Sequence, residues 1–223
     1  MAVDQNYKDV YHSFKRILFN IIEKKRYLMF SKILPTAGIL SLIFQPLIAI
    51  ASDDLPTGAS IISGDVSISN SSINSMDINQ MSDSGIINWD SFSVGVGNSV
   101  NFDNGSGATL NRVTGSDLSS IYGSLSATGS IYLINESGII FGDTGVVDVG
   151  GDFVGSTLGV DSSNFLNEGA TSFSGSGGGS IVNLGSISSS GGSVSLLSAS
   201  INNSGSIVAA DGAASLVAGT QIL

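Results

Sequence analysis

The sequence contains no cysteine, and its one histidine, His12, lies near the N-terminus. Without cysteine the chain can form no disulfide and no thiolate metal site, and it offers no thiol nucleophile. After His12 no imidazole remains, which excludes a Ser-His hydrolase site and a His-ligated zinc site from the body of the chain. We therefore expect no resident metal and no cofactor.

Basic residues are scarce and unevenly placed. Residues 1–32 hold seven of the eight Lys and Arg residues and three acids, whereas residues 33–223 hold a single Arg, Arg112, and fifteen acids. The N-terminal part therefore carries a net charge of +4 and the remainder −14. Because so acidic a body cannot neutralise phosphates, we expect no nucleic-acid partner.

Proline and charged residues are also rare, at three prolines and 12% charged residues, while glycine numbers 29. Disorder is typical of low hydrophobicity, but this chain is 42% hydrophobic with a mean hydropathy of +0.34. Short β-branched runs are interrupted every few residues by Gly, Asn or Ser, and a helical apolar period is missing. The sequence therefore predicts an all-β fold.

Residues 1–51 read as an extended signal peptide, followed by a mature domain at 52–223. A basic region ends at Arg26, an apolar stretch runs from Ile33 to Ile50, and Ala49-Ile50-Ala51 is a small-x-small cleavage site before Ser52. The alternative is a membrane anchor, since about 18 apolar residues approach the spanning minimum. The two prolines in this stretch and the cleavage site favour removal by the general secretion machinery.

The last 44 residues repeat with a period of twenty. Ser180–Ile187 matches Ser200–Ile207, and Val194–Leu197 matches Ala214–Val217. A twenty-residue period of short strands and turns without helix indicates a β-solenoid. At that period the mature domain would make roughly eight or nine coils. The sequence stops within the repeat, at apolar residues and without a cap. This suggests that the chain is the front piece of a longer rod.

Asn-x-Gly recurs at Asn167, Asn183 and Asn203, and these residues suit stacked turns in which Asn side chains bond from coil to coil. Trp89, Phe92 and Phe102 are expected to fill or cap the interior. The alternative for these aromatics is an exposed platform that stacks on carbohydrate. Residues 59–70 alternate like a strand pair and could cap the start of the stack.

The centre of the chain is Leu110–Gly142, which carries Arg112, the one basic residue after Lys32. We expect Arg112 to fix a loop by donating hydrogen bonds to carbonyl oxygens or to an acid such as Asp117. Residues 162–179 are the least regular part, and within them Ser174–Gly179 (SGSGGG) is expected to form a flexible loop rather than a phosphate-binding site.

The body resembles the N-terminal secretion domain of filamentous haemagglutinin-like exoproteins, which leave the cell by two-partner secretion. The resemblance covers nearly all of residues 52–223 in the expected order. The stretches that carry it are Leu55–Gly64 (LPTGASIISG), Ile86–Phe102 (IINWDSFSVGVGNSVNF), Leu110–Gly115 (LNRVTG), Ser119–Gly142 (SSIYGSLSATGSIYLINESGIIFG) and the Asn-x-Gly coils.

This resemblance implies a right-handed parallel β-helix with an N-terminal β cap. It implies a non-catalytic secretion and folding-initiation domain, recognised by a dedicated outer-membrane transporter with periplasmic docking domains. The protein would reach the surface of a Gram-negative bacterium through the periplasm and outer membrane. The residues expected to carry transporter recognition are Asn111, Arg112, Thr114, Asn135 and Gly138.

One motif departs from the family. The family often has Asn-Pro-Asn-Gly where this chain has Asn135-Glu136-Ser137-Gly138, so the proline is lost.

Two other functions remain open. As an adhesin segment, the domain would bind host glycans or proteins directly, although in large exoproteins such ligands are expected to bind downstream regions. A β-helix polysaccharide-degrading enzyme would need clustered carboxylates, or a calcium site with a basic residue as proton acceptor. The acids are scattered and Arg112 is the single basic candidate, so we expect no enzyme.

Overall fold

The computed structural model describes residues 55–168, 172–175 and 178–222, and these residues form a β structure with one short helix, α2. The predicted leader, with Ala49, Ala51 and Ser52, lies outside the described residues. The elements are β1 Ser60–Ser63, β2 Val66–Ser72, β3 Ser75–Gln80, β4 Ser84–Trp89, β5 Ser99–Asp103, β6 Ala108–Val113, β7 Ser119–Ile121, β8 Ser124–Ala127, β9 Ser130–Ile134, β10 Ile139–Phe141, β11 Val146–Val149, β12 Phe153–Ser156, α2 Ser162–Glu168, β13 Phe173–Ser174, β14 Ser180–Asn183, β15 Ser186–Ser189, β16 Val194–Ser198, β17 Ser200–Asn203, β18 Ser206–Ala209, β19 Ala214–Ala218 and β20 Gln221–Ile222.

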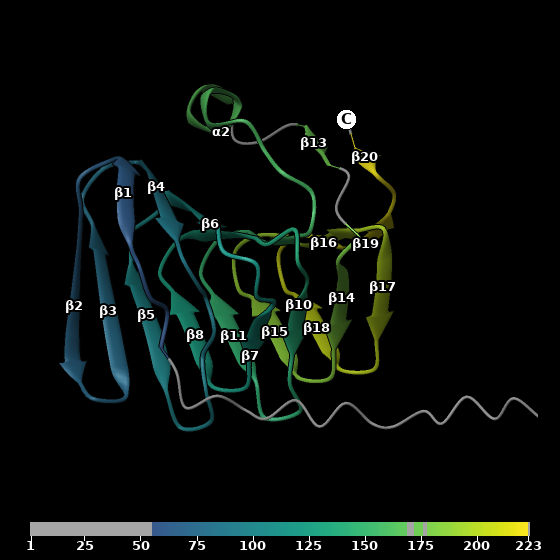
Figure 1. The fold of residues 1–223 in the computed structure, drawn as a ribbon, viewed down its shortest axis with the longest axis horizontal. Helices are drawn as coiled ribbons and strands as arrows, with labels where there is room; N and C mark the ends of the chain where they lie inside the picture. The colour runs from purple at the N-terminus through teal and green to yellow at the C-terminus, as the bar shows by residue number, and fades with distance from the viewer. Residues whose placement is uncertain (1–54, 169–171, 176–177, 223) are drawn as a thin grey trace, which may run out of the picture. The chain divides into compact units, whose positions relative to one another are not determined.

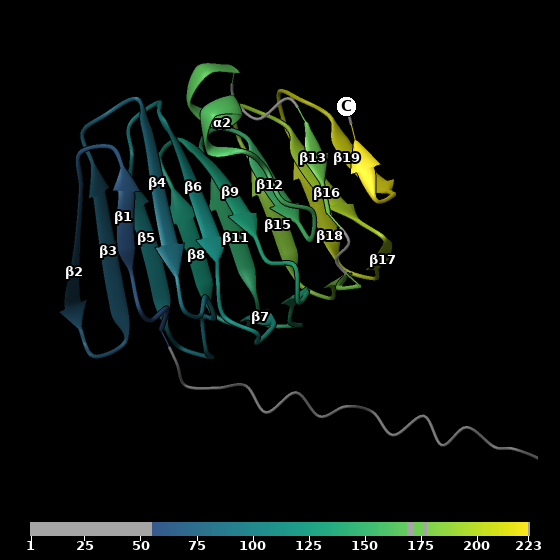
Figure 2. The ribbon, with the colours of Figure 1, turned by 45° about the horizontal axis from the view of Figure 1, so that its top comes forward.

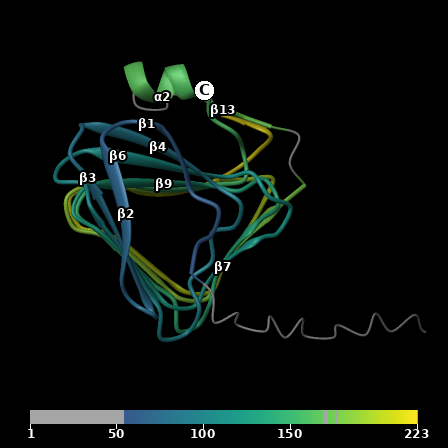
Figure 3. The same cartoon turned by 60° about the vertical axis from the view of Figure 1, so that its left-hand side comes forward.

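Successive coils stack their strands into three sheets (Figure 1). Sheet 1 has the order β1-β4-β6-β9-β12-β16-β19, sheet 2 the order β2-β3-β5-β8-β11-β15-β18, and sheet 3 the order β7-β10-β14-β17. Seen toward its N-terminal end, the stack encloses a three-sided interior (Figure 3). Except for β1 and β2, neighbouring strands in these sheets are parallel, which confirms the predicted β-solenoid.

The number of coils was predicted wrongly. Sheets 1 and 2 each contain six parallel strands, so the stack makes about six coils rather than eight or nine. The twenty-residue step is real in the last coil, where Val194 pairs with Ala214. Earlier coils are longer, since Ser84 pairs with Ala108, and the coil from Phe153 to Val194 contains an insertion of 41 − 20 = 21 residues relative to the last step.

The N-terminal end of the stack is closed by two antiparallel strands. β1 pairs with β4 at the edge of sheet 1, and β2 pairs with β3 at the edge of sheet 2. Both pairings contain a register shift, a device that discourages further strands from adding to an exposed edge. The predicted cap at residues 59–70 is confirmed, but its two strands pair with β4 and β3 rather than with each other.

Inward-facing side chains alternate along the strands and form one continuous apolar core. Trp89, Phe92 and Phe102 are 1%, 1% and 2% exposed, and the rings of Trp89 and Phe92 meet edge to face with centroids 5.4 Å apart. These aromatics therefore fill the interior as predicted, and the carbohydrate-platform alternative is wrong for them.

A second apolar cluster covers the outer face of sheet 1. The insertion after β12 forms α2 and β13, and Phe165 of α2 packs edge to face on Tyr132 of β9 with centroids 5.3 Å apart. Figures 1 and 3 show α2 and β13 over this side of the stack. The segment 162–179 is thus more regular than predicted, since Ser162–Glu168 is a helix and Phe173–Ser174 pairs antiparallel with β20. The flexible loop predicted at Ser174–Gly179 is wrong for Ser174, which belongs to β13.

The predicted ladder of turn asparagines holds for two of its three members. The amide nitrogen of Asn183 donates to Asn203 Oδ1 at 2.8 Å, one coil further on. Asn167 does not belong to the ladder because it lies in α2. Within the described ranges, no helix is both long and apolar enough to cross a membrane.

Candidate functional site

The segment Leu110–Gly142 runs from β6 to the end of β10 and makes about one and a half coils, since Leu110 pairs with Tyr132 one coil further on. β6 and β9 lie side by side in sheet 1 (Figure 2), and Arg112 pairs with Ile134 across them. Asn135 therefore begins its turn beside the end of β6. The fold thus brings the predicted residues together at one corner, where strands of sheet 1 end and the chain turns toward sheet 3.

Asn111 faces the interior and is fully buried. Its Oδ1 accepts a hydrogen bond of 3.0 Å from the indole nitrogen of Trp89, and its Nδ2 donates to the carbonyl oxygen of Thr109 at 3.5 Å. A buried indole N–H without an acceptor would destabilise the fold, so Asn111 completes the core of the first coils.

Arg112 faces outward from β6 and joins the coil to the insertion. Its guanidinium donates to the carbonyl oxygen of Val160 at 2.8 Å, to Ser162 Oγ at 3.3 Å and to Asn88 Oδ1 at 3.4 Å. The expectation of a carbonyl acceptor is confirmed. Asp117 is not among these acceptors in the described residues, and the acid whose charge interacts with Arg112 is Asp161.

The charge of Arg112 acts on Asp161, the residue that directly precedes α2. Asp161 Oδ1 accepts hydrogen bonds from the Ser163 hydroxyl, from Ser163 N at 2.9 Å and from Asn164 N at 3.1 Å. These bonds, led by the Ser163 hydroxyl and assisted by the charge of Arg112, lower the pKa of Asp161 from its ordinary value. The side chain is an N-cap, a feature of the sequence that could have predicted α2.

Thr114 is the one exposed member of the five predicted residues. Its hydroxyl donates to the carbonyl oxygen of Trp89 at 2.9 Å, and its backbone N–H donates to the same oxygen at 2.8 Å. Thr114 thus fixes the departure of the chain from β6 while its surface faces solvent.

Asn135 and Gly138 close a tight turn. Gly138 N donates to the Asn135 carbonyl at 3.1 Å, and Ser137 N donates to Asn135 Oδ1 at 2.9 Å. Gly138 has φ of +126°, a conformation that residues with a side chain rarely adopt, and a Cβ there would lie 3.2 Å from the carbonyl oxygen of Ser180. The turn therefore forms without the family's proline.

The side chain of Asn135 also ties this turn to the preceding one. Its Nδ2 donates to the Asp117 carbonyl and to Ser119 Oγ, both at 3.0 Å, and the residue is 1% exposed. All of its side-chain partners lie between residues 117 and 137. Asn135 is thus a local organiser of the coil, and a partner protein can reach it directly only while the coil is incomplete.

Among the described residues no group of three His, Cys, Asp or Glu side chains is placed to hold a metal ion.

Burial raises the pKa of Tyr132, with a further contribution from the charge of Asp152, and this tyrosine lies in the apolar cluster under α2. The described part of the chain leaves no buried side-chain nitrogen or oxygen without a hydrogen-bond partner.

Comparisons with known proteins agree with one another. The family model "TPS secretion domain" matches residues 50–223. The solved HMW1 secretion domain from Haemophilus influenzae is similar to the chain, with a TM-score of 0.69 and 30% identity over 74% of this chain and 45% of that one.

Two curated relatives are heme/hemopexin-binding proteins of Haemophilus influenzae. One, from strain Rd, is 36% identical over 102 residues, and the other is 34% identical over 103 residues. Each match covers 45% of this chain and 11% of the relative's length.

Proposed function

The chain belongs to the family of TPS (two-partner secretion) domains, and we propose that a dedicated outer-membrane transporter recognises it. The transporter is a barrel with periplasmic docking domains, and the route leads through the periplasm and outer membrane to the surface of a Gram-negative cell. In this role the domain initiates folding of the exoprotein and carries out no chemistry. Heme and hemopexin are ligands in the names of the relatives, and the short match assigns neither to this chain.

The proposed leader is residues 1–51, cleaved after Ala51 so that the mature domain begins at Ser52. The small-x-small sequence Ala49-Ile50-Ala51 supports this, as does the family match, which starts at residue 50. The general secretion machinery would recognise the leader and carry the chain across the inner membrane. N-terminal sequencing of exported protein tests this assignment, and a retained Met1 would contradict it.

Recognition is proposed to involve Asn111, Arg112, Thr114, Asn135 and Gly138 before the stack is complete. The observation that carries this proposal is the burial of Asn135, whose side-chain bonds reach only residues 117–137. A turn closed by such local contacts can form early, because its ordering does not wait for distant coils. A transporter can then select the chain through this turn while most of the stack is unfolded.

The test compares Asn135→Ala with Asn183→Ala, a matched change in a later coil. Asn183 is also fully buried, and its Oδ1 accepts from Gly185 N at 3.2 Å, two residues on, as Asn135 accepts from Ser137. We expect Asn135→Ala to lower the secreted yield more than Asn183→Ala at equal loss of melting temperature. If both variants lose export in proportion to stability, Asn135 is structural and the recognition role is wrong.

We also propose that host ligands bind other parts of the exoprotein. The relatives are about nine times longer than the matched segment, since it covers 11% of their length. Adhesion of the isolated mature domain to erythrocytes or to a glycan array would contradict this assignment.

A further inference from the structure

The outer face of sheet 3 carries an apolar patch between acidic corners. Residues 118, 120 and 122 face outward in the first of its coils, as do 140 and 142 in the next and 182 and 184 in the third, because the intervening residues are buried in the core. We define the sheet 3 patch as the five apolar side chains of this face, namely Leu118, Tyr122, Ile140, Val182 and Leu184.

The patch is contiguous across the three coils. Ile140 pairs with Val182 on the neighbouring strand, and Leu118 lies beside Gly138, whose Cβ position is 3.8 Å from Leu118 Cβ. The ring of Tyr122 lies over Gly142, where a methyl group would overlap it. Gly142 thus provides the space in which the ring lies flat on the sheet.

The patch faces solvent. Leu118 and Leu184 are 38% and 46% exposed, and Tyr122, Ile140 and Val182 are half-buried. The apolar outer face of sheet 1, by contrast, is covered by α2 and β13, which lie on another side of the stack (Figures 1 and 3). A bare apolar patch beside a covered one indicates a surface that a partner buries.

Both corners beside the patch carry exposed carboxylates. Asp117 and Glu136 lie at the corner with sheet 1, and Asp143 follows Gly142 at the corner with sheet 2. The single cation of residues 55–222, Arg112, already donates to Val160, Ser162 and Asn88. The fringe of the patch is therefore anionic, which suits apolar side chains flanked by Lys or Arg and repels anionic lipid.

We propose that the sheet 3 patch is the docking surface for a basic, apolar-centred protein surface on the periplasmic side of the transporter. This proposal rests on the proposed function and deepens it, because Leu118, Tyr122 and Ile140 belong to the same segment Leu110–Gly142. Two successive coils present these three side chains, so docking begins once the second of them closes. Val182 and Leu184 then extend the contact as later coils form.

The test uses the full chain, co-expressed with its transporter in Gram-negative cells. The photoreactive residue p-benzoylphenylalanine replaces Tyr122 or Ile140, and Ser126 on the outer face of sheet 2 serves as the control position. We expect light to join the chain to the transporter from positions 122 and 140 and not from 126. Equal adducts from 126, no adduct from the patch, or adducts only with a second copy of the chain or with lipid would each overturn the proposal.

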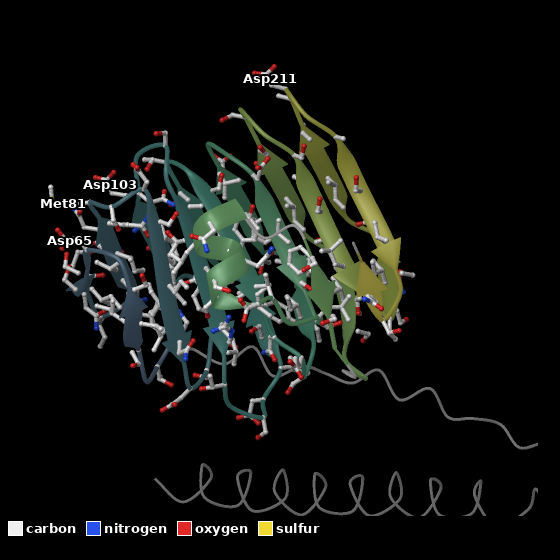
Figure 4. All side chains as sticks on the ribbon, turned by 90° about the horizontal axis from the view of Figure 1, so that it is seen from above. Asp65, Met81, Asp103 and Asp211 are labelled. Carbon is white, nitrogen blue, oxygen red and sulfur yellow. The ribbon has the colours of Figure 1, made fainter. Side chains whose placement is uncertain are left out.

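Charge variants test the anionic fringe. Asp117→Asn, Glu136→Gln and Asp143→Asn together should lower the adduct yield from position 122 about fivefold. The matched control neutralises Asp65, Asp103 and Asp211, which lie at the corner between sheets 1 and 2, Asp103 at the end of β5 and the other two between strands (labelled in Figure 4), and should leave the yield unchanged. Equal effects of the two triple variants would contradict a specific fringe.

Failure of this inference differs from failure of the proposed function. Export that needs the transporter, with adducts arising from other surfaces, overturns only the sheet 3 patch. Export that is independent of the transporter overturns the proposed function.

Discussion

Arg112 shows how one residue can serve a purpose that its sequence neighbours do not reveal. It lies on β6, yet its shortest hydrogen bond, 2.8 Å, reaches the carbonyl of Val160, 48 residues away. Together with the bonds to Ser162 and Asn88, this bond connects the second coil to the insertion that covers sheet 1. A guanidinium suits this position because its fork of donors can serve several acceptors at once.

Replacing Arg112 by Ala should lower the free energy of unfolding by about 1–2 kcal/mol, because three acceptors around the insertion lose their donor. Arg112→Lys keeps the charge but not the fork, and should recover only part of the loss. Urea unfolding of the three proteins measures this. Equal stability of wild type and Arg112→Ala would show that the hydrogen bonds of Arg112 contribute nothing to the free energy of unfolding.

Asp161 makes stability depend on acid. Its pKa in the folded protein lies below its ordinary value of 3.8, chiefly through the Ser163 hydroxyl. A carboxyl with a lowered pKa in the folded state contributes stability above its unfolded pKa and loses it as the pH falls through the folded pKa. We expect Asp161→Asn, which still caps α2, to lose less stability than wild type between about pH 4 and pH 2.

Thermal melts across this range test the Asp161 prediction. Asp77, whose pKa is also lowered through Ser71 and Asn101, remains in both proteins and gives them a common background. Parallel pH profiles for wild type and Asp161→Asn would contradict it.

Among the elements, the turn after β9 depends on glycine at one position. Gly138 combines φ of +126° with the carbonyl of Ser180 at 3.2 Å from its Cβ position, whereas Gly105 has φ of +56° and open space around it. Gly138→Ala should therefore lower the melting temperature clearly more than Gly105→Ala, with a cost of about 1–3 kcal/mol for the strained backbone. Equal melting temperatures would mean that the turn relaxes at no cost.

Which elements the sequence predicts depends on how local their signals are. The match of Val194–Leu197 with Ala214–Val217 predicts a pairing that the structure contains residue for residue. The earlier coils are harder to predict because their steps vary, from 24 residues between Ser84 and Ala108 to 22 between Ile131 and Phe153. The helix α2 is too short for an apolar period, and its one signal was the capping residue Asp161.

The sequence predicted where the turn of the candidate site lies in the chain, but not which residues its side chains contact. The turn Asn135–Gly138 forms where the sequence puts it. The partner of Asn111 is Trp89, 22 residues earlier, and becomes adjacent only when β4 and β6 pair. The sheet 3 patch was missed for the same reason, since Ile140 and Val182 are 42 residues apart in sequence. Which residues of neighbouring coils meet depends on the register of their strands. The sequence does not reveal this register because the number of residues per coil varies.

At the scale of the whole molecule, the described domain is a stack with a closed N-terminal end and a single polarity. The strands of each inner coil pair with the coils before and after, so an ordered coil offers the next coil an edge on which to pair. Such order suits a chain that emerges from a transporter with its N-terminus first. The absence of cysteine is compatible with this route, because a disulfide formed in the periplasm would obstruct an unfolded chain.

The central claim is that a two-partner transporter exports this chain. The most direct measurement is the amount of mature domain in the medium of Gram-negative cells that express the full chain with or without the cognate transporter, with periplasmic protein as the control for synthesis. The account predicts secreted domain only when the transporter is present and accumulation in the periplasm when it is absent. Equal secretion from both strains would contradict it.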